Sequence, residues 1–293
     1  MTLLRLGIYC LLSFVPFWII LPRMNAFYGG PVYMSEAAEG AVYVLGIFGM
    51  LIPAAAHVCT RLVTKEGFRD SYLALHFKGN ELWYLASFGI KLLEGFLGLF
   101  LVWRLYASHL SFAEAFLVDQ SKNVIAMLLA QLAFSIGVCF PAFGEEWGWR
   151  GYMMPKLMEL MSKPAAIFCG GLIWGLWHAP LTIAGHNFGV DYPMYPWAGI
   201  FKMCLMCILM NAVLTLLTEK TKSIYPATFY HMVNNNMSMS VLVMLVGTEA
   251  LERALESAST FYVIYVPLLS ITAVLSVLCF VRSPHKETSE KNT

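Results

Sequence analysis

The chain has 293 residues, of which 59% are hydrophobic and only 13% are charged, and its formal net charge is +1. A typical soluble domain carries about 25% charged residues, so this composition and a mean hydropathy of +0.66 indicate a membrane protein. The balanced charge, with no basic block interleaved with aromatic residues in the sequence, argues against a nucleic-acid partner.

Apolar stretches long enough to cross a membrane occur at about eight places along the chain. A helix needs roughly 20 residues to span a hydrocarbon core of about 30 Å, and these stretches lack the alternation that is typical of barrel strands. They lie at residues 3–21, 41–58, 82–105, 124–143, 165–184, 197–217, 224–246 and 261–281. The sequence therefore predicts an all-α, polytopic membrane protein, in which residues 1–293 form a single integral membrane domain.

Lys and Arg residues fall unevenly between the predicted spans. Thirteen of the 19 lie on one side of the membrane in this arrangement, four lie on the other side, and Lys91 and Lys202 lie inside it. Because cytoplasmic loops carry the excess of positive charge, both termini are predicted to be cytoplasmic, as an even number of spans requires. A short polar tail and the lack of a targeting signal favour a bacterial plasma membrane, with eukaryotic organelle membranes as the alternative.

The seven cysteines lie mostly within the apolar stretches. This placement is typical of buried hydrophobic cysteine rather than of a disulfide framework. Cys204 and Cys207 form a CxxC pattern, but they lie in the middle of a predicted span without a neighbouring strand pattern. The pattern therefore does not favour a redox or a metal role.

A first polar cluster directly follows the apolar stretch 124–143. On a helix, Glu146 and Arg150 are four residues apart and can pair on one face, whereas Glu145 points about 100° away and can face a cavity. One carboxylate can then be structural while its neighbour stays available as a general base. The alternative is an ordinary charge cluster at a helix end near the cytoplasm.

Two further clusters each contain a histidine within an apolar stretch. His178 lies about two-thirds of the way through residues 165–184, one helical turn after Trp174. His231 and Asn235 are four residues apart, so their side chains share one face of a helix and can reach the same atom. Hydrogen-bonded packing is the alternative for His178, and amide bonds between helices are the alternative for Asn235.

The three clusters together resemble the CAAX-protease and bacteriocin-processing family of intramembrane metalloproteases, also grouped as Abi or prenyl-endopeptidase-like proteins. The family's three motifs read here, in chain order, as Glu145, Glu146 and Arg150, then Trp174 and His178, then His231 and Asn235. They occur on three different predicted spans within residues 120–250, which would form the family's catalytic core. Trp174 stands where phenylalanine is commoner, and this change keeps an aromatic wall.

The resemblance implies an endopeptidase that hydrolyses a peptide bond of a membrane-associated or prenylated peptide or protein, with its active site inside the helix bundle. Glu145 would take a proton from the attacking water and return it to the leaving amine. The other residues that the resemblance places in the catalytic group are Glu146, His178, His231 and Asn235, with Arg150 and Trp174 as supporting residues. Neither the identity of the substrate nor the oligomeric state can be read from the sequence.

The same donors permit a divalent metal, and the usual classification of the family with metalloproteases favours Zn²⁺. Two neutral imidazoles, a carboxylate and an amide oxygen suit zinc. The candidate ligands are Glu146, His178, His231 and Asn235. Alternatively, the two histidines and Asn235 donate hydrogen bonds to the developing oxyanion, and the sequence does not separate the two.

Two other functional classes are compatible with buried charges. One is a carrier or channel that uses the buried Glu and His residues for protons or cations, although the chain lacks the internal duplication that many transporters show. The other is a protease-like membrane protein that acts as a non-catalytic immunity or regulatory partner. Lys91 and Glu94, three residues apart inside a predicted span, are expected to neutralise each other, with a substrate path as the second interpretation.

The predicted depths of the motifs in the membrane conflict. Glu145 falls near the cytoplasmic end of its span, whereas His178 falls about 20 Å deeper at a rise of about 1.5 Å per residue. Either the first helix continues inward past Gly148 and Gly151, or the next helix begins later than Ala165. In both cases the motif side chains are predicted to converge in a cavity that opens toward the cytoplasm.

Overall fold

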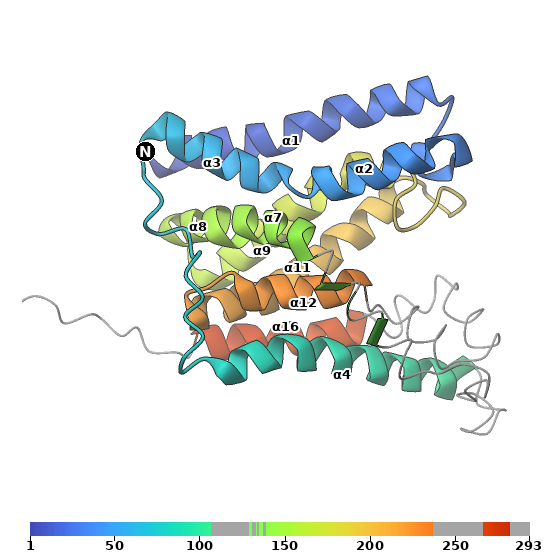
Figure 1. The fold of residues 1–293 in the computed structure, drawn as a ribbon. Helices are drawn as coiled ribbons and strands as arrows, with labels where there is room; N and C mark the ends of the chain where they lie inside the picture. Colours follow the sequence, from blue (N-terminus) through green and yellow to red (C-terminus); the bar gives the residue numbers. More distant parts are fainter. Residues whose placement is uncertain (107–128, 131–132, 134, 137–138, 237–265, 282–293) are drawn as a thin grey trace, which may run out of the picture.

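The computed structural model describes residues 1–106, 129–130, 133, 135–136, 139–236 and 266–281, and these residues form helices joined by turns, with no strand among them. Most of the helices lie side by side along one common direction (Figure 1). The all-α fold class predicted from the apolar stretches is confirmed for this part of the chain.

The first part of the chain contains four helices and two short 3₁₀ turns, Val32–Met34 and Glu36–Ala38. The helices are α1 (Thr2–Phe27), α2 (Glu39–Gly49), α3 (Ile52–Thr64) and α4 (Glu81–Tyr106). The predicted stretch 41–58 is thus two helices, which are bent by 40° at the break between them. Pro53 lies at the start of α3, where its missing N–H costs nothing because the first N–H groups of a helix have no partner within it.

The second part carries the three motifs. Its helices are α7 (Cys139–Gly148), a π-helix (Trp149–Met153), α8 (Met154–Leu160), α9 (Lys163–Trp177), α10 (Ala179–Ile183), α11 (Trp197–Thr221), α12 (Tyr225–Asn236) and α16 (Val266–Val281). The segment from Cys139 to Leu160 is helical throughout, so the helix that carries Glu145 does continue past Gly148 and Gly151. The first of the two expected solutions to the depth conflict is therefore the observed one.

Four of the described helices, α1, α4, α9 with α10, and α11, are long and apolar enough to cross a membrane, and a fifth span results if the bent pair α2–α3 counts as one. The predicted spans 124–143, 224–246 and 261–281 lie partly outside the described residues. An integral membrane protein is therefore supported, while the count of about eight spans stays a prediction.

Three glycines let helices approach one another closely around the motifs. A Cβ atom on Gly148 would lie 2.4 Å from the Cβ of Pro53, and one on Gly144 would lie 2.6 Å from Leu51, so α7 rests directly on the break between α2 and α3. In the same way, a Cβ on Gly175 of α9 would lie 2.4 Å from the Cα of Cys204 on α11. Small residues one turn apart allow such close approach of membrane helices.

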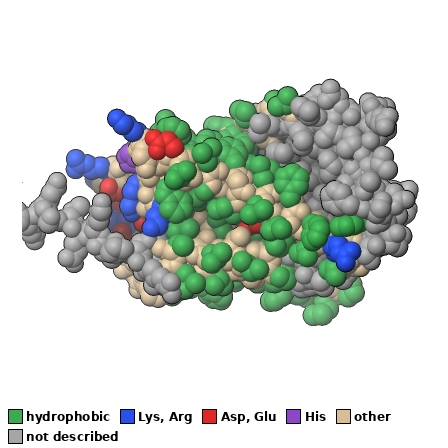
Figure 2. All heavy atoms as spheres, turned by 90° about the horizontal axis from the view of Figure 1, so that it is seen from below, with side chains coloured by type: hydrophobic (Ala, Val, Ile, Leu, Met, Phe, Trp, Pro, Cys, Tyr) green, Lys and Arg blue, Asp and Glu red, His purple; other side chains and the backbone are tan. Residues whose placement is uncertain are grey.

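The surface separates apolar and charged side chains along the direction of the helices. Figure 2 shows hydrophobic side chains over the middle of one face, with Lys and Arg side chains gathered mainly at one end. The N-terminus lies at that same end in Figure 1. An apolar band with a basic end is the distribution expected of a protein that spans a bilayer.

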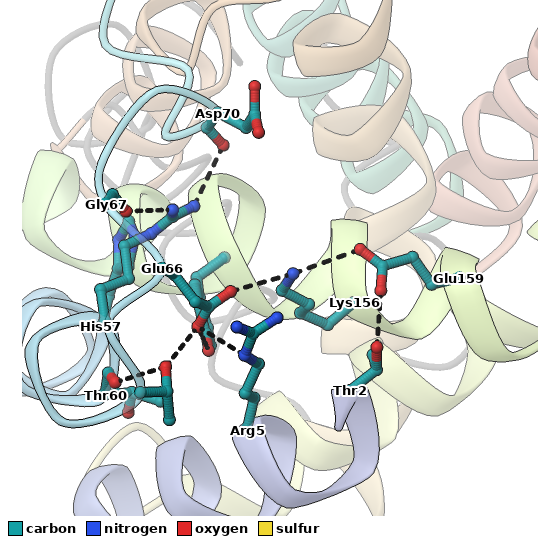
Figure 3. A network of polar contacts seen from close by, with 12 residues as sticks. Thr2, Arg5, His57, Thr60, Glu66, Gly67, Asp70, Lys156 and Glu159 are labelled. Atoms are coloured by element: carbon teal, nitrogen blue, oxygen red, sulfur yellow. Dashed lines mark hydrogen bonds and ion pairs between the residues drawn. The ribbon is translucent and has the colours of Figure 1, made fainter.

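A polar network at the basic end joins α1, the end of α3 and α8 (Figure 3). Its centre is the carboxylate of Glu66, which accepts hydrogen bonds from the hydroxyl groups of Tyr152 (2.6 Å) and Thr64 (2.9 Å). The ammonium group of Lys156 lies 3.1 Å from Glu66, and the guanidinium of Arg5 lies 3.5 Å away. The network therefore fixes the end of the helix that carries the first motif.

Candidate active site

A cavity of about 530 Å³ lies between the helices that carry the three motifs. Its polar lining includes the side chains of Glu145 from α7, His178 from the end of α9, and His231 and Asn235 from α12. Much of the remaining wall is apolar, and examples are Phe17, Leu45, Leu181, Met203 and Leu268. The structure therefore brings residues from all three motifs to one cavity with largely hydrophobic walls.

Glu145 is buried, and one of its carboxylate oxygens is held by two indole groups. The Nε1–H of Trp174 donates to Oε2 at 2.8 Å, and the Nε1–H of Trp149 donates to the same oxygen at 3.2 Å. These two hydrogen bonds orient the carboxylate, and neither of them uses Oε1. Glu145 can therefore present one positioned carboxylate oxygen to the cavity that its side chain lines.

Glu146 faces a different set of partners, as the helical geometry predicted. Its Oε1 lies 3.0 Å from Nη1 of Arg150 and 2.7 Å from Nδ1 of His231. The side chains of Glu146 and Arg150 are 0% and 1% exposed. The predicted pairing of Glu146 with Arg150 is confirmed, and the same carboxylate also holds His231 in place.

Arg150 also joins two motifs through an aromatic contact. Its guanidinium carbon lies 4.2 Å from the centre of the Trp174 ring, which is a cation–π distance. The ring of Trp174 in turn meets that of His231 edge to face, with centroids 5.4 Å apart. Trp174 thus forms the predicted aromatic wall, and its N–H group additionally orients Glu145.

His178 lies at the break between α9 and α10. The break is explained by Pro180, which has no N–H to continue the hydrogen-bond ladder and stands near the start of α10. The Nδ1 of His178 lies 2.9 Å from the carbonyl oxygen of Trp174, so in a neutral imidazole the proton is on Nδ1 and Nε2 is an acceptor. Irregular backbone at membrane depth is tolerated where it lines a cavity.

Asn235 lies near the end of α12, beside the cavity. Its Oδ1 accepts a hydrogen bond from Nδ2 of Asn234 at 3.1 Å. With its oxygen engaged in this way, the amide has its two Nδ2–H donors available. Asn235 can therefore act as a neutral hydrogen-bond donor toward a group in the cavity.

The described residues do not gather a set of ligands that is ready for a metal ion. Within that part of the chain, no three His, Cys, Asp or Glu side chains lie close enough together to hold one. Glu146, one of the four predicted ligands, is engaged by Arg150 and His231 instead. The donors as arranged do not fit Zn²⁺, and we derive no catalytic step through a metal.

The seven cysteines are all described and all free. The expectation that they are buried holds for only two of them, because Cys59 and Cys279 are exposed and three others are partly exposed. Cys204 and Cys207 are buried on α11. The Sγ of Cys207 lies 3.9 Å from Nδ1 of His178, and both residues line the cavity.

Two residues near the site were not identified from the sequence. Trp149 directly follows Gly148, and its N–H bond to Glu145 depends on the helical spacing of four residues. His57 is fully buried in α3, where its Nδ1 lies 3.0 Å from the carbonyl oxygen of Trp147, and Nε of Arg61 donates to its Nε2. An ionisable ring inside the apolar stretch 41–58 was the available signal for His57.

The contact of His57 lies next to the irregular part of the motif helix. The π-helix Trp149–Met153 widens the helix directly after the two glutamates, and such π turns inside helices occur frequently at functional sites. Arg61, which donates to His57, also donates to the carbonyl oxygens of Gly67 and Asp70; His57, Gly67 and Asp70 are labelled in Figure 3. The loop after α3 is thereby connected to the backbone of the first motif.

Comparison with known proteins gives a family match and a named relative. Residues 125–237 match the family model "Type II CAAX prenyl endopeptidase Rce1-like". A protein of Methanococcus maripaludis named "CAAX prenyl protease 2" is 29% identical over 110 residues, which are 37% of this chain and 40% of that protein. The chain thus covers less than half of that relative. The resemblance expected from the three motifs is confirmed, because residues 125–237 are similar to the Rce1-like family of type II CAAX prenyl endopeptidases.

Proposed function

We propose that the chain is an intramembrane endopeptidase that hydrolyses a peptide bond of a membrane-associated substrate. The observation that carries this proposal is the shared cavity, in which a buried, oriented carboxylate lies with two histidines and an amide among apolar walls. A peptidase is also what the match of residues 125–237 supports. These contacts do not favour the alternative function of a carrier or channel, because the charges of Glu146 and Arg150 neutralise each other at 3.0 Å.

Glu145 is the proposed general base. Because Trp174 and Trp149 both donate to Oε2, Oε1 is the atom that would accept a proton from water as the water attacks the scissile carbonyl. The protonated carboxyl would then return the proton to the leaving amine, which requires it to act as base and acid in turn. His178, with Nε2 as an acceptor, would orient the second hydrogen of the same water.

The developing oxyanion needs hydrogen-bond donors that are already in position. Asn235 can supply one through Nδ2, since its Oδ1 is engaged by Asn234. The ring of His231 lines the same cavity, and its Nδ1 lies 2.7 Å from Oε1 of Glu146, which orients the ring beside the position of the oxyanion. Glu146 and Arg150 act in this proposal by holding His231 rather than by touching the substrate.

The apolar walls suit a substrate with a hydrophobic anchor. The cavity of about 530 Å³ is within the range of about 300 to 1,000 Å³ that is typical of ligand sites. The named relative is a CAAX prenyl protease, so the proposed substrate is a prenylated or otherwise lipid-anchored peptide or protein. We further propose about eight spans in a bacterial plasma membrane, with both termini in the cytoplasm.

The test is cleavage of a panel of farnesylated, palmitoylated and unmodified peptides by the purified protein in liposomes. Glu145→Gln keeps an oxygen to accept the two indole N–H groups but cannot take up a proton, so cleavage should be lost. Glu159→Gln is the matched control, since that carboxylate lies on the surface of α8. A chelator arm tests the zinc ion that the family resemblance favours, and intact wild-type protein that cleaves no peptide would contradict the proposal.

A further inference from the structure

An ion pair inside the membrane lines the same cavity as the candidate catalytic residues. Nζ of Lys91 lies 2.9 Å from Oε2 of Glu94, both on α4. Their side chains are only 9% and 7% exposed, and both belong to the cavity lining together with Glu145, His178 and His231. Charged residues within membrane spans are costly, and those that persist commonly mark substrate or ion pathways.

The acceptor oxygens of Glu94 are engaged, whereas Lys91 has N–H donors left. The carboxylate of Glu94 accepts from Lys91 and also from the hydroxyl of Tyr230, at 3.2 and 3.1 Å to its two oxygens. An ammonium group has three N–H donors, and among the described residues Glu94 is the hydrogen-bond acceptor that the structure gives Lys91. Lys91 can therefore bind an acceptor in the cavity while Glu94 stays satisfied.

Lys91 and Glu94 contact α12, the helix that carries His231. Tyr230, which donates to Glu94, directly precedes His231 on α12, and Nζ of Lys91 lies 5.5 Å from the centre of the Tyr230 ring. Helix α4 packs against α12. These contacts therefore hold the ammonium group of Lys91 in a fixed position relative to His231, unlike the ammonium group of a surface lysine.

We propose that Lys91 binds a carboxylate of the peptide substrate, with Glu94 and Tyr230 holding the ammonium group in place. This inference rests on the proposed endopeptidase function and adds a specificity determinant to it. In a cavity with mainly apolar walls, an acidic group of the peptide is the substrate chemistry that matches an ammonium donor. The carboxylate can be the free C-terminus of the peptide or an acidic side chain, and the experiment separates the two.

Mutual neutralisation alone is the simpler account of the pair. It explains the 2.9 Å contact, but it does not require both side chains to line the cavity of the catalytic residues. Lys202 provides the comparison, because it is also a buried lysine in a predicted span. Lys202 lies over the rings of Phe188 and Tyr192, at 5.4 and 5.3 Å, and it is not part of the cavity lining.

The test measures binding of a fluorescent, lipid-anchored peptide in three forms to the Glu145→Gln protein, in which bound peptide is not expected to be cleaved. The forms are the free C-terminal carboxylate, the C-terminal carboxamide, and the free carboxylate with every Asp and Glu replaced by Asn and Gln. Each peptide is measured against three proteins: Glu145→Gln alone, Glu145→Gln with Lys91→Gln, and Glu145→Gln with both Lys91→Gln and Glu94→Gln. The last protein keeps the size of both side chains and removes both charges. Lys202→Gln is the matched control.

With Lys91 present, the peptide that carries the recognised carboxylate should bind about ten to one hundred times more tightly than the peptide from which that carboxylate has been removed. This factor is the size of a charge-assisted hydrogen bond. Weaker binding of the carboxamide identifies the C-terminus as the recognised group, and weaker binding of the peptide without Asp and Glu identifies a side chain. Lys91→Gln and the double variant should abolish this preference and leave the affinity for the peptide without the recognised carboxylate unchanged, and Lys202→Gln should keep the preference. An equal preference in the neutral double variant, or none in the protein that retains Lys91, would overturn the inference.

Failure of the inference and failure of the proposed function give different results. If the wild-type protein cleaves peptides but shows no preference for a carboxylate, the inference falls and the endopeptidase stands. If the preference depends on Lys91 but the wild-type protein cleaves nothing, the carboxylate site stands and the endopeptidase falls. If the folded protein binds none of the peptides, the inference is overturned as well.

Discussion

Arg150 is the residue whose replacement should expose the energetics of the motif cluster most clearly. It is 1% exposed and lies 3.0 Å from Glu146, which is 0% exposed. In Arg150→Met, the carboxylate of Glu146 loses its permanent countercharge and keeps only His231 at 2.7 Å. Breaking a buried pair in this way costs about 3 to 5 kcal/mol, and the remaining histidine places the expected loss near the lower value.

A loss of about 3 kcal/mol corresponds to a fall in Tm of roughly 6 to 12 °C for a domain of this size class. Replacing both partners, with Glu146→Gln and Arg150→Met, should recover most of that loss because no unpaired charge stays buried. The assay is thermal unfolding of the purified protein in detergent, followed by tryptophan fluorescence. Equal Tm values for Arg150→Met and the wild type, or purely additive effects in the double variant, would refute the reasoning.

Three further predictions follow from the packing and the polar network. Gly175→Ala should destabilise the protein by about 1 to 3 kcal/mol through overpacking, because the new Cβ would lie 2.4 Å from the backbone of Cys204, whereas Gly7→Ala on open surface should not lower the Tm. His57→Leu should lower the cleavage rate by releasing the Trp147 carbonyl, and His57→Asn, which restores an N–H donor, should recover part of the rate. Burial raises the pKa of Glu66, but hydrogen bonds from Tyr152, Lys156 and Thr64 outweigh burial and hold the pKa below 4.5. The ionised carboxylate therefore stabilises the folded protein above pH 4.5, and this stabilisation is lost as the pH falls below that value. The Tm of Glu66→Gln should accordingly depend less on pH below pH 4.5 than the Tm of the wild type.

The sequence predicted those features of the site that depend on position along one helix. Glu146 and Arg150 are four residues apart, and the expected pair forms. Lys91 and Glu94 are three residues apart, and they also pair. The i, i+3 and i, i+4 contacts of a helix depend on its periodicity alone, which explains why a single sequence suffices for them.

Features that depend on contacts between helices could not be read from the sequence. The bond from Trp174 to Glu145 joins residues 29 positions apart, and the contact of His57 with Trp147 joins residues 90 positions apart. Periodicity carries no information about either contact. The sequence did contain the glycines at 144 and 148 that permit the close approach of α7 to α3, but its pattern does not say which helix they face.

The depth conflict between Glu145 and His178 has a similar origin. A hydropathy pattern ends a span where polar residues begin, so the charges of Glu145, Glu146 and Arg150 suggested a helix end. In the structure Glu146 pairs with Arg150, Glu145 is held by two indole groups, and the helix continues to Leu160. Polar residues that pair or are hydrogen-bonded inside the bundle do not terminate a membrane helix.

The central claim, that the oriented carboxylate of Glu145 activates water, is tested most directly by the single-turnover cleavage rate of one lipid-anchored peptide. The rate is measured for the wild type, Glu145→Gln and Glu159→Gln in the same liposomes, with unfolding temperatures measured in parallel. We predict that Glu145→Gln loses at least about 10²- to 10⁴-fold in rate, the usual contribution of a general base, at an unchanged Tm, while Glu159→Gln keeps the wild-type rate. Cleavage by folded Glu145→Gln at the wild-type rate would contradict the account.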